Sequence, residues 1–297
     1  MAEILPGIYL DVPDDEYRAW PYPSYSLLSA FRDEGLCELD VEYRMANPTE
    51  TTPQMELGTM VEIATHNPDV LMGNVEPLPD DIKQRRGKRW EALQEEYPGI
   101  EFLPQYEYQK WLSGVRQAVD MAEAVKAYPL TAKLIEGAQR QVSFIWDATF
   151  RGASGAPVTH RVKGRLDYLN TEKDIIVDLK TGARGGQRAF GRSLWQYAYD
   201  VQSSLYTDAM NSLRGKTHRF YFAVVRSTPP YPVTVYNGHQ TTEQQQPDTL
   251  LNIGRFAYQQ YLEQLSECRS TGYWRGYFAP DAPDGLILDI MLPPWAV

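Results

Sequence analysis

The sequence predicts a mixed α/β fold in which helices flank a central sheet. Segments of alternating character at residues 141–150, 161–170 and 175–180 are joined by turn-forming stretches, and they predict three consecutive antiparallel strands. Helical segments lie before and after this unit, and two further apolar runs follow in the C-terminal half. Of the 297 residues, 43% are hydrophobic and 23% are charged, which is ordinary for a globular protein with a substantial core.

The segment before the strands predicts mainly helices. Ser24 or Ser26 is a suitable N-cap for a short helix that follows an irregular start. Residues 55–66 predict a second helix, which Asn67-Pro68 ends. Residues 90–133 have a helical pattern that three prolines interrupt.

The segment after the strands predicts a helix, two strands and another helix. The first helix runs from about Ala189 to Leu213, after Gly185-Gly186 breaks the chain. Residues 219–227 are apolar enough for the interior of a sheet, and Pro232 suggests that the next strand lies at an edge. Residues 241–269 predict the last helix, and the Pro/Gly-rich tail predicts a short final strand.

Charge and cysteine content limit the function classes. The net charge of −10 argues against a protein that coats nucleic acid by bulk attraction, but it does not exclude a nucleic-acid enzyme, because the local field matters there. Cys37 and Cys268 are too few and too far apart for a disulfide framework, so we expect a reducing, cytoplasmic setting. The sequence predicts neither a secretory signal nor a membrane span.

The hairpin at residues 161–182 carries the chemistry. If Asn170 pairs with Ile175 across the polar turn, Asp167 falls opposite Asp178, with Cβ atoms ~5 Å apart on the same face. Lys180, two residues beyond Asp178, shares that face.

Two opposed carboxylates repel each other, and a divalent cation between them would turn the repulsion into coordination. Mg²⁺ favours carboxylate oxygen, and a neighbouring lysine can offset charge that develops on a phosphate. The alternative is that Asp167 and Asp178 are solvated strand ends that Lys180 screens. A phosphate-binding glycine loop, a nucleophile with a base partner and zinc-type histidine spacing are all missing from the sequence.

Other polar residues stand out less clearly. Glu62 lies on the predicted helix at 55–66, with His66 one turn further on, and helical glutamates are usually solvated. Gln202 and Tyr206 share a face of a later helix, where core-edge packing is the plainer interpretation. Several positive residues could contact DNA phosphates. Arg32 could equally be an ordinary surface arginine, and the basic segment at 83–89 could be a solvated loop. The residues concerned are Arg32, Lys83, Arg85, Arg86, Lys88 and Arg89.

Together these motifs resemble the PD-(D/E)XK nuclease superfamily. The pattern is Gly164-x-x-Asp167, then Asp178-x-Lys180, then Gln202-x-x-x-Tyr206. The chain resembles in particular the C-terminal nuclease domain of exonuclease VIII (RecE type), which is related to lambda exonuclease. Further matching motifs, in the family's order, are Gly7-Ile-Tyr, Leu57-Gly58-Thr59 and Leu292-Pro-Pro-Trp295. The similarity spans nearly the whole chain, so we expect a single exonuclease domain over residues 1–297 with a restriction-endonuclease-like core.

The resemblance implies roles for individual residues. Asp167 and Asp178 would bind one or two Mg²⁺ or Mn²⁺ ions, together with the backbone carbonyl of Leu179. Lys180 would position or deprotonate the attacking water. Gln202 and Tyr206 would support the site and the scissile strand.

One position departs from the family pattern. Many members have a histidine directly after Leu-Gly-Thr-x-x, where this chain has Glu62. Glutamate can bind Mg²⁺ through oxygen, so we expect Glu62 to complete the metal site, and His66 is the weaker candidate.

The resemblance also implies a 5′ to 3′ exonuclease of linear double-stranded DNA, in a phage or prophage setting. It would leave 3′ overhangs for a single-strand annealing partner of the RecT type, and it would form a ring-shaped trimer or tetramer around the DNA. One alternative is a single-strand or flap nuclease of the RecB-like or CRISPR-associated type, although the cluster cysteines common in the latter are missing. Another is a non-catalytic DNA-binding module.

Overall fold

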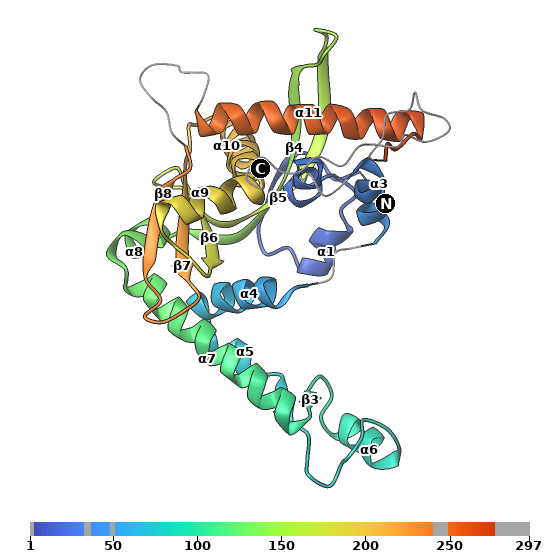
Figure 1. Ribbon diagram of the computed structural model, residues 1–297, viewed down its shortest axis with the longest axis vertical. Coiled ribbons are helices and arrows are strands. Elements are labelled where there is room, and N and C mark those ends of the chain that lie inside the picture. The colour runs from blue at the N-terminus through green and yellow to red at the C-terminus, as the bar shows by residue number, and fades with distance from the viewer. Residues whose placement is uncertain (1–2, 33–36, 48–50, 240–248, 277–297) are drawn as a thin grey trace, which may run out of the picture.

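The computed structural model describes residues 3–32, 37–47, 51–239 and 249–276, which form a mixed six-stranded sheet between layers of helices (Figure 1). The strand order is β1-β4-β5-β6-β7-β8; β6 and β7 are parallel and all other neighbours are antiparallel. The strands are β1 (Gly7–Tyr9), β4 (Gln139–Arg151), β5 (Pro157–Asn170), β6 (Ile175–Gly182), β7 (Arg219–Arg226) and β8 (Val233–Asn237).

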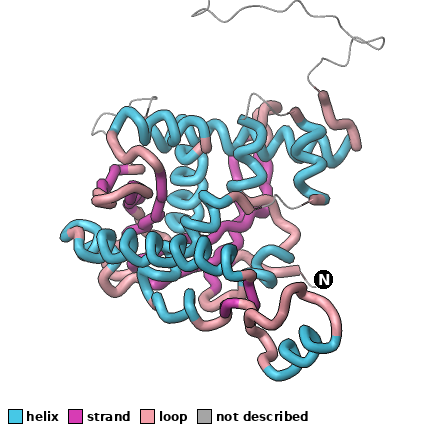
Figure 2. Tube along the Cα trace, turned by 60° about the horizontal axis from the view of Figure 1, so that its bottom comes forward, coloured by secondary structure: helices cyan, strands magenta, loops and turns pink. Residues whose placement is uncertain are grey.

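Helices cover both faces of this sheet (Figures 1 and 2). On one face, α10 (Tyr199–Arg214) and α11 (Leu250–Thr271) bury apolar side chains against β4, β5 and β7. On the other, α4 (Pro53–His66), α7 (Gln105–Ala127) and α8 (Pro129–Ile135) do the same against β6 and β7. The shorter elements are α1 (Asp14–Ala19), α2 (Tyr25–Leu28), η1 (Ser29–Arg32), α3 (Glu38–Ala46), α5 (Pro68–Met72) and α9 (Gln187–Gln196).

The end of α7 extends away from the sheet and carries a small separate unit (Figure 1). This arm contains α6 (Lys88–Glu96) and the parallel pair of β2 (Val75–Pro77) with β3 (Glu101–Leu103). No helix in the described part of the chain is long and apolar enough to cross a membrane.

The predicted fold class is confirmed, and so is the order of its three antiparallel strands. The connection from β6 to β7 passes through α9 and α10, and such a crossover is what allows neighbouring strands to be parallel. The predicted tail strand and the Leu292–Trp295 motif lie outside the described residues.

The single helix predicted from Ala189 to Leu213 is wrong, because two helices occupy this segment. Tyr197 ends α9, and Ala198 has a left-handed backbone with φ of 52° before α10 starts. The sequence contains no glycine or proline at this break, so the usual signal for a helix end is missing. The break places α10 over the sheet while α9 packs separately through Phe190 against Phe222 and Tyr236.

Gly164 on β5 allows two aromatic rings to lie directly over the strand. A Cβ at this position would come within 2.3 Å of the Phe144 ring and 2.8 Å of the Tyr206 ring. The two rings meet edge to face with centroids 5.4 Å apart. The glycine of the Gly164-x-x-Asp167 motif is therefore explained by packing beneath the candidate site.

We predict that Gly164→Ala destabilises the protein by about 1–3 kcal/mol, because an added methyl overpacks a filled core. Thermal melting should show a fall of roughly 2–4 °C for each kcal/mol. Gly185→Ala is the matched control, since a Cβ there would meet no atom within 4 Å. Equal melting temperatures for the two variants would contradict this explanation.

Candidate active site

The predicted register of β5 and β6 is confirmed, and it ends just before the two aspartates. Asn170 pairs with Ile175, and the last pair of the ladder is Tyr168 with Val177. Beyond it, a carboxylate oxygen of Asp167 accepts a hydrogen bond from the backbone N–H of Leu179 at 2.8 Å. The Asp167 side chain thus takes the place of the next backbone hydrogen bond between β5 and β6. The candidate site therefore lies where these two strands stop pairing.

Asp178, Lys180 and Gln202 form a closed set of polar contacts. Gln202 donates from Nε2 to Asp178 Oδ1 at 2.6 Å, and Lys180 donates from Nζ to Gln202 Oε1 at 3.0 Å. Lys180 Nζ also lies 2.8 Å from Asp178 Oδ2. Because the amide of Gln202 satisfies an anion and a cation at once, α10 fixes both catalytic candidates of β6 in place.

Burial and neighbouring charges determine how this site ionises. The pKa of Asp167 is raised well above its usual value, first because the group is surrounded by protein, and then by the negative charges of Asp178 and Glu62. Burial opposes the charge on Lys180, but its pKa is nevertheless raised, mainly by Asp178. Tyr199 contributes as well, since its ring centroid lies 4.3 Å from Lys180 Nζ. Lys180 is therefore a permanent cation in the site.

Tyr206 supports the site through packing. It is buried, and its ring contacts Phe144 and Tyr25 at centroid distances of 5.4 and 6.4 Å. Burial raises the pKa of its hydroxyl well above the ordinary value, so the hydroxyl stays neutral. Gln202 and Tyr206, which the sequence placed on one helix face, thus have different roles. Gln202 forms hydrogen bonds with Asp178 and Lys180, whereas Tyr206 packs in the core beside them.

Glu62 lies near the aspartates without completing a cluster with them. It lines a pocket of about 410 Å³ together with Asp11, Arg140 and Gln141. Burial raises its pKa, and a hydrogen bond from the Gln141 side chain acts in the opposite direction. Within the described residues, no three acidic, histidine or cysteine side chains form a group that could bind a metal as they stand.

His66 belongs to a different contact. Its Nε2 lies 2.8 Å from the hydroxyl of Tyr168, and the two rings pack with centroids 5.2 Å apart. Tyr168 follows Asp167 directly on β5, so the two side chains point to opposite faces of the sheet. Burial, followed by the charges of Arg140 and Lys126, lowers the pKa of His66 to about 4. This geometry favours Glu62 over His66 as the third ligand.

The predicted DNA-contacting arginines are not gathered at this site. Arg32 forms a two-pronged ion pair with Asp200 at the start of α10, donates from Nε to Tyr261 at 3.3 Å, and stacks over Trp195. Its side chain is only 9% exposed, so its main role here is to position α10.

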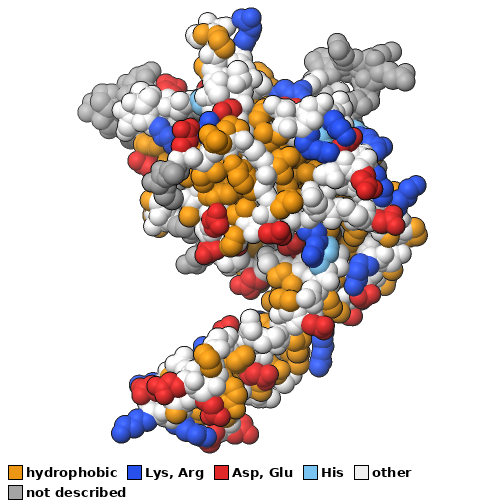
Figure 3. Space-filling model, turned by 180° about the vertical axis from the view of Figure 1, so that it is seen from behind, with side chains coloured by type: hydrophobic (Ala, Val, Ile, Leu, Met, Phe, Trp, Pro, Cys, Tyr) orange, Lys and Arg blue, Asp and Glu red, His pale blue; other side chains and the backbone are white. Residues whose placement is uncertain are grey.

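The basic patch lies on the arm instead. Arg85 pairs with Glu107 at 3.3 Å and Arg89 with Asp81 at 3.0 Å, while Arg86 and Lys88 are exposed beside them. Figure 3 shows charged side chains of both signs at the end of this arm, away from the main body.

The sequence did not indicate a role for Gln141, a residue of β4 that the strand register places opposite Asp167 on β5. Arg140 pairs with Tyr168 and Val142 with Leu166, so the position between them faces Asp167. Gln141 has a left-handed backbone with φ of 47°, an uncommon conformation that occurs preferentially at functional sites. A glutamine in an alternating strand carries no signal for this conformation, so the sequence offered no way to find it.

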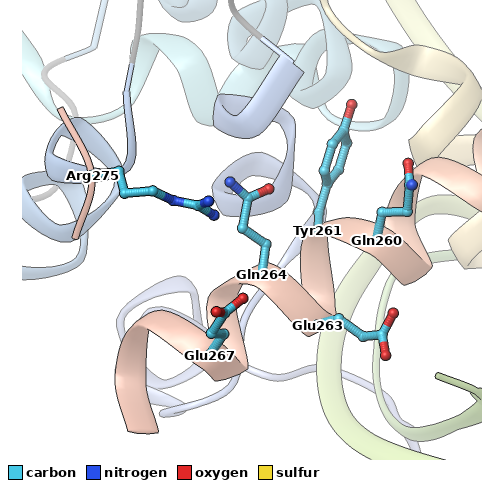
Figure 4. Close-up of a pocket in the computed structure, with 6 residues that line it drawn as sticks. All are labelled: Gln260, Tyr261, Glu263, Gln264, Glu267 and Arg275. Carbon is cyan, nitrogen blue, oxygen red and sulfur yellow. The ribbon is translucent and has the colours of Figure 1, made fainter. Parts of the chain in front are cut away.

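A second pocket, of about 350 Å³, contains none of the predicted site residues (Figure 4). It lies along α11, next to a buried contact in which Arg275 and Gln264 donate to the Glu38 carboxylate. Although burial acts in the opposite direction, these hydrogen bonds lower the pKa of Glu38 to about 2. The lining residues are Gln260, Tyr261, Glu263, Gln264, Glu267 and Arg275.

The donor set at the point where β5 and β6 stop pairing fits a hard divalent cation. Asp167 and Asp178 offer carboxylate oxygens close together, and Asp178 Oδ2, which is buried, lies 2.8 Å from the Lys180 ammonium group. Mg²⁺ commonly uses one or two protein carboxylates and takes its remaining ligands from water and substrate phosphate. A mixed sheet with this acid–lysine pair where its strands separate, backed by a Gln-x-x-x-Tyr helix, is the arrangement of a PD-(D/E)XK-like nuclease.

Comparison with known families agrees with this class. The model of the family described as "PDDEXK-like domain of unknown function (DUF3799)" matches residues 24–277, and the chain belongs to that family. No curated protein sequence matches the chain.

The fold is shared with a solved structure. A crystal structure described as "Putative exonuclease" from Eubacterium rectale superposes with a TM-score of 0.57 at 13% identity, covering 96% of this chain and 97% of that one. A second structure, described as SSO0001, superposes with a TM-score of 0.27 at 12% identity, over 67% of this chain and 83% of that one.

We predict that Glu62→Gln weakens Mg²⁺ binding by about tenfold or more, because metal affinity falls on that scale even when only a supporting group is lost. His66→Asn should leave the affinity nearly unchanged, since His66 is engaged with Tyr168. Isothermal titration of the DNA-free protein with Mg²⁺ measures both. A loss confined to the His66 variant would exclude Glu62 as the third ligand.

Proposed function

We propose that the protein is a metal-dependent exodeoxyribonuclease that degrades the 5′-ended strand of linear double-stranded DNA. The observation that carries this proposal is the closed contact set of Asp178, Lys180 and Gln202 next to Asp167. Membership of a PDDEXK-like family and the fold shared with a protein described as a putative exonuclease support it. The 3′ overhangs left behind would serve recombination by strand annealing.

In this proposal the acidic residues hold the metal. Asp167, Asp178 and Glu62 would bind one or two Mg²⁺ or Mn²⁺ ions, and the carbonyl of Leu179 would add a ligand. Such ions supply a water of lowered pKa and stabilise charge on the attacking and leaving oxygens. Bound this way, the metal would add to the positive charge of Lys180 in offsetting the interaction between Asp167 and Asp178.

Lys180 would act on the phosphate or on the attacking water. It is cationic, largely enclosed with a side chain 17% exposed, and held by Gln202 from the side of α10. A fixed positive charge in such a setting offsets charge that develops on a phosphate oxygen without needing to reorganise. Gln202 would hold the ammonium group in this position next to Asp178 when the substrate binds.

The proposed assembly is a ring-shaped trimer or tetramer that encloses DNA, with a RecT-type annealing protein as partner. A ring could combine a basic inner wall with an acidic outside, which would reconcile DNA binding with the net charge of −10.

The test is a digest with Mg²⁺ of one linear duplex carrying a label at either the 5′ or the 3′ end, alongside the same sequence as a closed circle. We expect early release of the 5′ label, retention of the 3′-ended strand and an intact circle. Asp178→Asn should be inactive, whereas Asp147→Asn, a strand aspartate paired with Arg161 outside the site, should remain active. Cleavage of single strands alone would favour the flap-type nuclease, and binding without cleavage would favour a non-catalytic module.

A further inference from the structure

The segment that leads from the catalytic strand into α10 carries an unusual charge balance. Residues 181–199 contain Arg184, Arg188 and Arg192 but no aspartate or glutamate, in a chain whose net charge is −10. All three arginines are exposed, and no ion pair or hydrogen bond of their side chains occurs within the described residues. Positive charge that no acidic side chain neutralises attracts anions, so this segment beside the candidate site is suited to bind an anionic ligand.

Helix α9 presents two of these arginines on one face together with a tryptophan. Residues at spacings of three and four share a helix face, so Arg188, Arg192 and Trp195 line up. Phe190 and Leu194 lie on the opposite side, where Phe190 packs against Tyr236 with ring centroids 4.6 Å apart. Arg188, Arg192 and Trp195 together form the α9 face.

The aromatic end of this face is open to solvent and held in place from beneath. Trp195 is 59% exposed, yet the guanidinium of Arg32 lies 4.5 Å from its ring centroid. Arg32 is itself fixed by its ion pair with Asp200. One side of the indole is therefore covered by a fixed cation, while the rest of its surface is free to take a flat ligand.

A chain of aromatic contacts connects this point to the catalytic lysine. Tyr197, 51% exposed, follows at the helix break, where its carbonyl accepts a hydrogen bond from the Tyr25 hydroxyl. Its ring lies 5.6 Å from that of Tyr199, whose ring centroid lies 4.3 Å from Lys180 Nζ. The exposed rings are thus continuous with the candidate active site.

We propose that the α9 face, with Tyr197, binds the unpaired end of the DNA strand at the active site. Arg188 and Arg192 contact backbone phosphates, and Trp195 and Tyr197 stack on unpaired bases. Arginines that follow a backbone, combined with exposed aromatic rings, are the usual means of holding single-stranded nucleic acid, and stacking needs no particular base. This inference rests on the proposed nuclease function and specifies which part of the substrate α9 takes.

The inference is tested by binding of a fluorescent single-stranded oligonucleotide in EDTA, where metal-dependent cleavage cannot occur. For Arg188→Ala/Arg192→Ala, the plot of log affinity against log salt should become shallower by about 1.4, because each lost phosphate contact on a single strand contributes about 0.7. The arm double variant Arg86→Ala/Lys88→Ala loses the same charge from exposed positions and should keep the wild-type slope.

The aromatic part has its own readout. Trp195→Ala should weaken single-strand binding by roughly 5- to 150-fold with an unchanged salt slope, as expected for the loss of one stacked base. Trp195→Phe should recover part of the affinity. Equal losses on a blunt duplex and on the single strand would overturn the assignment to unpaired bases.

The outcomes separate this inference from the proposed function. If the wild-type protein degrades linear DNA but the α9 variants keep both affinity and salt slope, or if only the arm variant changes the slope, the inference is wrong and the nuclease function stands. If the wild-type protein neither binds nor cleaves DNA, both are wrong.

Discussion

The candidate site depends on keeping two neighbouring aspartates, Asp167 and Asp178, enclosed in the protein, where the charge of Lys180 offsets theirs. Asp167 and Asp178 stand beyond the last pair of β5 and β6, and the pKa of Asp167 is raised by burial and then by the charge of Asp178. A raised carboxyl pKa means that the folded state loses stability as pH rises from the unfolded value of about 3.8 through the folded value. Above that range the metal-free protein therefore carries a free-energy cost at these two carboxyl groups, which a bound cation would offset.

Much of the surrounding architecture serves to keep this arrangement in place. Gln202 can reach both Asp178 and Lys180 because α10 lies directly over β6, and α10 begins only after the backbone turns at Ala198. Asp200 in the first turn is fixed by Arg32, and Gly254 of α11 packs so closely that a Cβ would come within 2.0 Å of the Asp200 carbonyl oxygen. The buried ion pair and the close helix contact thus set the height and angle of α10 above the site.

The sequence was sufficient for the parts that depend on local pattern. Alternation and turn composition predicted the strands and the Asn170–Ile175 register, and helical spacing placed Gln202 with Tyr206. The parts that failed depend on distant contacts or on unusual backbone. Arg32 appears as a surface arginine in sequence, but Asp200, 168 positions away, makes it a buried one. The left-handed conformations of Gln141 and Ala198 have no glycine to mark them, and the isolation of the basic patch follows from how far α7 extends.

The most direct test of the site is the melting temperature of wild-type protein and Asp167→Asn, each with and without Mg²⁺ at neutral pH. Asparagine keeps the shape and can still accept the Leu179 N–H, but it removes one of the two charges. The variant should melt higher than wild type without metal, by roughly 2–4 °C per kcal/mol of repulsion removed, and should lose the rise that Mg²⁺ gives the wild type. A variant that melts no higher without metal and keeps the full Mg²⁺-dependent rise would contradict a metal site at these aspartates.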